Sequence, residues 1–62
     1  MPTHAQVLEA FDALGGDTNH PMALAKRLEN EGFSASDVVD AINAALASGE
    51  LVQTPLGNLQ RA

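Results

Sequence analysis

The chain has 62 residues, of which eight are acidic and three basic, and its formal net charge of −5 repels polyanions. It has no cysteine, which excludes disulfide bonds and cysteine-ligated zinc, and it has no apolar run long enough to span a membrane. Because Met1–His4 does not resemble a signal peptide and 45% of the residues are apolar, we expect one folded, cytoplasmic domain over residues 1–62.

The first predicted helix begins after Thr3. Thr3 and Gln6 have the spacing of a capping box, in which each side chain bonds to the other residue's backbone N–H. Four apolar residues then recur on one helical face: Val7, Leu8, Phe11 and Leu14. Gly15-Gly16 is expected to end this helix, since glycine readily adopts the left-handed conformation of a helix stop.

A turn is predicted between the first and second helices. Asp17 and Asn19 are typical turn and cap residues, and we expect His20 to be partly exposed before the next helix. Pro21 suits the first position of that helix, where its missing N–H costs nothing. The predicted buried stripe is Met22, Leu24, Ala25 and Leu28, and the predicted outer side is Lys26, Arg27, Glu29 and Asn30.

The second helix is expected to end in a Schellman motif at Gly32. In that motif the residues at C3 and C″ make a hydrophobic contact, and here these residues are Leu28 and Phe33.

A third helix is predicted from Ser34 as N-cap, with Asp37 at N3, where a carboxylate suits the positive end of the helix. Gly49 is expected to close it. The predicted core stripe is Val38, Ala41, Ile42, Ala45 and Leu46. The predicted opposite face is Asp37, Asp40, Ala44 and Ala47, with Asn43 beside it.

The remaining residues predict a β-hairpin. Leu51–Thr54 and Leu59–Arg61 are the expected strands, and Pro55–Asn58 is the expected turn. The predicted fold class is therefore α+β, mostly α: a three-helix bundle with a C-terminal β-hairpin. The expected core is Val7, Leu8, Phe11, Leu14, Leu24, Leu28, Phe33, Val38, Ile42, Leu46, Leu51 and Leu59.

This order of elements resembles the winged-helix (winged helix-turn-helix) superfamily. The resemblance covers nearly the whole chain and rests on Leu24-Ala25-x-x-Leu28, Val38-x-x-Ala41-Ile42-x-x-x-Leu46 and Gly49-x-Leu51-Val52. It implies that Ala25 lets the third helix cross closely, that Gly49 turns that helix into the wing, and that the hairpin around Gly57 is the wing.

The resemblance also implies DNA binding through the third helix and the wing. The residues available for such contacts are Lys26, Arg27, Asn43, Gln53, Asn58 and Arg61. Known DNA-binding proteins make about 6–10 phosphate contacts, and the third helix of this chain has no Lys or Arg with which to read guanine. DNA binding is therefore the alternative interpretation.

The favoured interpretation is a small acidic module that recognises another protein. Small side chains allow a partner helix to approach closely, and the acids beside them favour a basic partner. The residues predicted to bind the partner are Asp37, Asp40, Asn43, Ala44 and Ala47. Weak self-association through this alanine-containing face is a further alternative.

We expect neither catalysis nor a metal or cofactor. Ser34, Ser36 and Ser48 have no histidine nearby in sequence, and Asp17–His20 does not continue as a calcium-binding loop. Gly32-Phe33 followed by Val38-x-x-Ala41-Ile42 also resembles a ubiquitin-associated domain, a family that requires another helix after Gly49.

Overall fold

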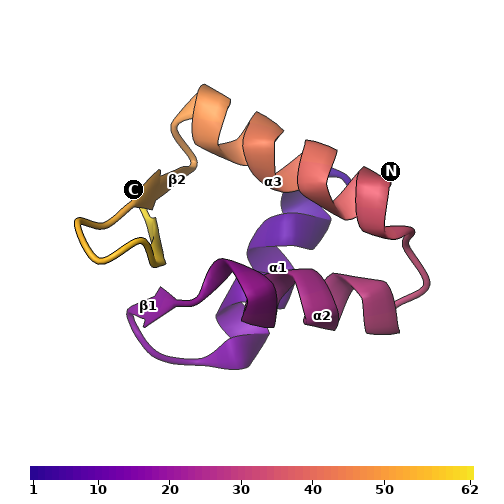
Figure 1. The fold of residues 1–62 in the computed structure, drawn as a ribbon, viewed down its shortest axis with the longest axis horizontal. Coiled ribbons are helices and arrows are strands. Elements are labelled where there is room, and N and C mark those ends of the chain that lie inside the picture. The colour runs from indigo at the N-terminus through magenta and orange to yellow at the C-terminus, as the bar shows by residue number, and fades with distance from the viewer.

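The computed structural model covers all 62 residues and contains three helices and a small antiparallel sheet (Figure 1). The elements, in chain order, are α1 (His4–Leu14), β1 (Thr18–Asn19), α2 (Pro21–Asn30), α3 (Ala35–Ser48), β2 (Leu51–Gln53) and β3 (Leu59–Arg61). The predicted fold class is confirmed. The residues after Gly49 form strands, so the helix that a ubiquitin-associated domain requires there does not exist.

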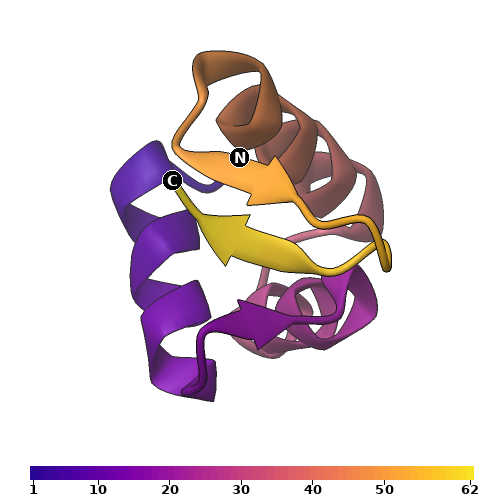
Figure 2. The ribbon, with the colours of Figure 1, turned by 90° about the vertical axis from the view of Figure 1, so that its left-hand side faces the viewer.

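The structure has one strand that the sequence did not predict. Residues 17–20 were expected to form a turn, but Thr18 and Asn19 pair with Gln60 and Leu59 as strand β1. The sheet order is β1-β3-β2, so β3 lies between the other two strands (Figure 2). The sheet therefore joins the α1–α2 connection to the hairpin.

The capping box predicted at the start of α1 is present. The Gln6 backbone N–H donates to Thr3 Oγ1 at 3.1 Å, and the Thr3 N–H donates to Gln6 Oε1 at 2.8 Å. Gly15 ends the helix, as predicted, but its φ of 77° and ψ of 174° lie outside the left-handed helical region that was expected.

Helix α2 begins at Pro21, as predicted, but its N-cap is His20 and neither Asp17 nor Asn19. His20 Nδ1 accepts a hydrogen bond from the Met22 N–H at 3.0 Å. The imidazole can replace the usual hydroxyl or carboxylate because its unprotonated nitrogen is an acceptor. Asn19 acts in the turn instead, where its Nδ2 donates to the Gly15 carbonyl.

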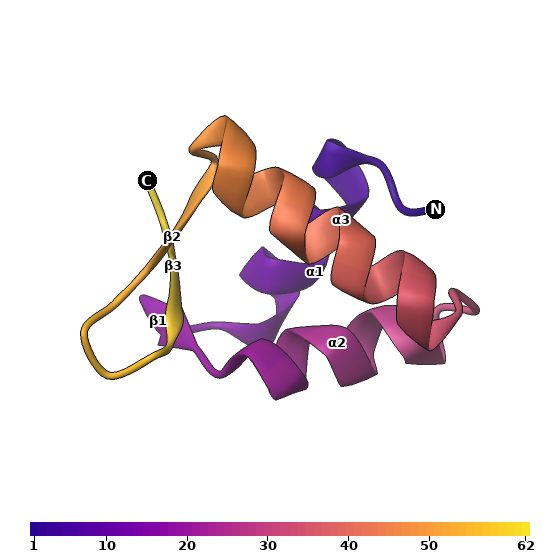
Figure 3. The same cartoon turned by 45° about the horizontal axis from the view of Figure 1, so that its top comes forward.

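The Schellman motif predicted after α2 is also present. The Phe33 N–H donates to the Leu28 carbonyl, and the Gly32 N–H donates to the Glu29 carbonyl. The short connection that follows allows α3 to return across α2, with α1 behind both helices (Figures 1 and 3).

Helix α3 begins and ends at the predicted residues. Ser34 Oγ accepts from the Asp37 N–H at 3.2 Å, and Gly49 adopts the left-handed conformation, with φ 83° and ψ 6°. The Glu50 and Gly49 N–H groups donate to the Ala45 and Leu46 carbonyls, which makes this end a second Schellman motif.

The N-cap of α3 provides a stability test. Replacing Ser34 with alanine should lower the free energy of unfolding by about 1 kcal/mol, because the Asp37 N–H loses its acceptor. The control is Ser36→Ala, since Ser36 is also exposed, lies in the first turn and makes no side-chain hydrogen bond. Urea unfolding of both variants measures the difference, and equal midpoints would contradict the capping role.

One hydrophobic core joins the helices to the sheet. Its buried members are Val7, Ala10, Phe11, Leu24, Leu28, Val38, Ala41, Ile42, Ala45, Leu51 and Leu59. Four of the predicted core residues, Leu8, Leu14, Phe33 and Leu46, are only partly buried at its edge. Ala10 is also buried, on the side of α1 that packs against the rest of the core.

Candidate functional site

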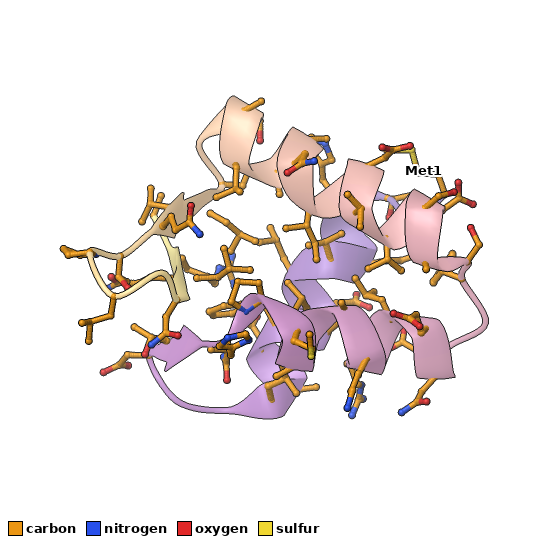
Figure 4. All side chains as sticks on the ribbon, viewed as in Figure 1. Met1 is labelled. Atoms are coloured by element: carbon orange, nitrogen blue, oxygen red, sulfur yellow. The ribbon has the colours of Figure 1, made fainter.

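The five residues of α3 predicted to bind a partner divide into two groups. Asp40, Asn43 and Ala47 are exposed and lie along the outward face of the helix. Asp37 and Ala44 are half-buried at one border of this face. The amino group of Met1 lies 3.6 Å from Asp37 Oδ2, and Figure 4 shows Met1 beside the first turns of α3. The carboxylate of Asp37 is therefore already paired with the amino group of Met1, whereas that of Asp40 has no salt bridge and can meet a partner.

An apolar groove follows the other border of this face. It has a volume of about 510 Å³, lies between α2 and α3, and is lined by His20, Pro21, Met22, Ala25, Lys26, Glu29, Val39, Ile42 and Asn43. Two residues of this set were predicted from the sequence: Asn43 for either a protein partner or DNA, and Lys26 for DNA alone. The structure brings the two residues together in one groove.

Two large apolar side chains of the groove are exposed. Met22 was predicted to be buried, but it is 59% exposed. It lies in the first turn of α2, on the side that faces the groove rather than the core. Val39 is 55% exposed, because it lies outside the stripe of α3 that faces the core, which is formed by Val38, Ala41, Ile42 and Ala45. Exposed apolar side chains gathered in one hollow are typical of a binding surface.

The basic residues are few, and most are already paired. Arg27 Nε lies 3.2 Å from Glu31 Oε2 one turn along α2, and Arg61 Nη1 lies 2.7 Å from Asp12 Oδ2 on α1. Lys26 is the one basic side chain without a salt bridge. The residues predicted for DNA contact therefore offer one unpaired cation.

The hairpin turn holds a leucine almost fully in solvent. The Thr54 N–H donates to the Asn58 carbonyl at 2.7 Å, and the Gly57 N–H donates to the Thr54 carbonyl at 2.8 Å. Gln53 Nε2 also donates to the Gly57 carbonyl at 3.3 Å. These bonds fix the turn and leave Leu56 90% exposed. Gln53 and Asn58, the hairpin residues predicted for DNA contact, thus contribute to the turn itself.

A histidine, an acid and a serine meet where α3 turns into β2, although the histidine is distant in sequence from the other two. His4 Nδ1 and Ser48 Oγ both contact Glu50 Oε1. Catalytic triads place the histidine between the acid and the hydroxyl, so that it can take the hydroxyl proton. Here the acid is in the middle, and the arrangement ties α1 to the end of α3.

No family model, curated protein or solved structure matches this chain. None of the three helices combines the length and apolar character needed to cross a membrane.

Proposed function

We propose that this chain is a small, non-catalytic recognition module of winged-helix type that binds another protein through α3 and the adjoining groove. Three helices followed by a hairpin, with Gly49 at the turn out of α3, support the winged-helix assignment. The three-stranded antiparallel sheet is compatible with it.

The observation that carries the proposal is the composition of the surface around α3. Its outward face has an exposed acid, Asp40, and no base, and it borders a hollow in which Met22 and Val39 are exposed. Desolvating such apolar side chains is the main favourable contribution to most protein–protein association. A phosphate backbone would instead gain little from them and would be repelled by Asp40.

The chain's charges favour a protein partner over DNA for a second reason. Non-specific and specific DNA binding both depend on neutralising phosphates, and the chain offers Lys26 as its one unpaired basic side chain. Arg27 and Arg61 could contact DNA only if each left its salt bridge within the chain. The chain therefore has no basic patch that would offset its net charge of −5.

Titration with duplex DNA tests this proposal. Isotope-labelled protein at low salt should show no concentration-dependent amide shifts on adding duplex DNA, because too few phosphates can be neutralised. Heteronuclear NMR spectra provide the measurement at each residue. Shifts that cluster on Lys26, Asn43, Gln53 and Asn58, and that fade as salt is added, would establish the DNA-binding alternative instead.

A further inference from the structure

We propose that the groove between α2 and α3 binds a short amphipathic helix of a partner protein, with an apolar stripe on one side and Lys or Arg side chains flanking it. This inference rests on the proposed function, and it specifies the chemistry of the partner.

The length and walls of the groove fit a helix of about two turns. Along α2 the lining residues run from Pro21 to Glu29, and eight steps of 1.5 Å correspond to about 12 Å, or a little over two helical turns. Ala25 and Ile42 form the apolar floor between the exposed Met22 and Val39. A helix presenting apolar residues at i and i+3 or i+4 would place two side chains between these walls.

The same surface suits a peptide better than a small polar ligand. Small-molecule sites fix the orientation of their ligand with a few precisely placed polar groups in an enclosed pocket. In this chain no polar or charged residue is buried, and no buried side-chain nitrogen or oxygen lacks a hydrogen-bond partner. The polar residues of the groove stand at its rim, where they can meet the flanks of a helix.

The charges around the groove, more than those of its lining, favour a basic occupant. Glu29 lines the groove from α2, and Asp40 follows Val39 on the exposed face of α3. Lys26 is the one cation among the lining residues, and the whole chain carries −5. Basic side chains beside the apolar stripe would therefore be attracted to the groove, both at a distance and in contact.

A second copy of this chain fits the groove less well. Two copies each carrying −5 repel one another, and the large exposed apolar residues of α2 and α3, Met22 and Val39, already belong to the groove. The occupant therefore has the opposite charge and supplies its own apolar stripe.

The probe is a synthetic helical peptide of about 14 residues, with leucines at heptad a and d positions and lysines and alanines elsewhere. Two companion peptides test the two halves of the proposal. One replaces the lysines with glutamates, and the other replaces the leucines with serines. NMR titration of the labelled protein should give shifts centred on Met22, Ala25, Val39 and Asn43 with the first peptide alone.

Two variants of identical composition separate groove binding from general attraction to an acidic protein. Val39→Glu and Val52→Glu both change an exposed valine to glutamate, and Val52 lies on β2, away from the lining residues. Val39→Glu should weaken binding about tenfold or more, although its added negative charge attracts the lysines, because an apolar contact is lost. Val52→Glu should leave the dissociation constant within about twofold.

The results distinguish failure of this inference from failure of the proposed function. Equal weakening by both variants, equal binding of the glutamate or serine peptide, or a dissociation constant above about 1 mM for the lysine peptide would overturn the helix-in-groove proposal. A concentration-dependent mass with Val39 at the interface would also overturn it in favour of a second copy. The proposed function fails separately, if duplex DNA gives the salt-sensitive shifts described above.

Discussion

Replacing Leu59 with alanine should leave the protein largely unfolded at 25 °C. Leu59 is 1% exposed and belongs to the core in which the sheet meets the helices. Truncating a buried leucine costs about 2–5 kcal/mol, and a core of this size rarely provides more than about 3–5 kcal/mol in total. Circular dichroism during urea and thermal unfolding would measure the loss.

Leu56, only three residues earlier, is a matched control. Leu56→Ala removes the same atoms from a side chain that is 90% exposed. The free energy of unfolding of this variant should therefore stay within about 0.5 kcal/mol of that of the parent protein. If both variants lost the same stability, the placement of Leu59 in the core would be wrong.

Gly49 is a second position where a single substitution should destabilise the protein. Its left-handed conformation, with φ 83°, costs a residue with a side chain about 1–2 kcal/mol. A Cβ atom placed there would meet no heavy atom within 4 Å, so the penalty comes from the backbone conformation and not from a clash. Gly49→Ala should therefore lower the free energy of unfolding by about 1 kcal/mol, as measured by urea denaturation.

The control for this prediction is Gly49→Asn. Both substitutions reduce the freedom of the unfolded chain, but asparagine tolerates the left-handed region better than alanine does. The asparagine variant should be the more stable of the two. An alanine variant as stable as the parent protein would contradict the left-handed stop at the end of α3.

Local chemistry predicted the helices well, but it could not predict the strand β1. Each helix starts and ends at residues that lie within a few positions of one another. Thr3 and Gln6 mark the start of α1, and Gly32 and Phe33 mark the end of α2. Thr18 and Asn19 show no alternation of apolar and polar residues. They form a strand because β3, which is distant in sequence, lies alongside them and pairs with them.

The acidic character of the α3 face was visible in the sequence, whereas the groove beside it was not. Periodicity assigned Met22 to the buried stripe of α2, and only the crossing of α2 and α3 shows that its side of the helix meets a hollow. One signal was available: Val39 lies outside the core stripe of Val38, Ala41, Ile42 and Ala45, so an apolar side chain is left at its border. The pairing of Arg61 with Asp12 likewise needed the tertiary structure.

The central position of β3 has a consequence for the time course of folding. Asn19 and Leu59 are about 40 positions apart, yet they are paired neighbours in the sheet. Contacts so distant in sequence require a large loop to close and form slowly, whereas the helix pair α2–α3 closes a short one. We therefore expect α2 and α3 to pack together before β1 pairs with β3. Weakening the sheet should accordingly shorten the lifetime of the folded state more than it slows its formation.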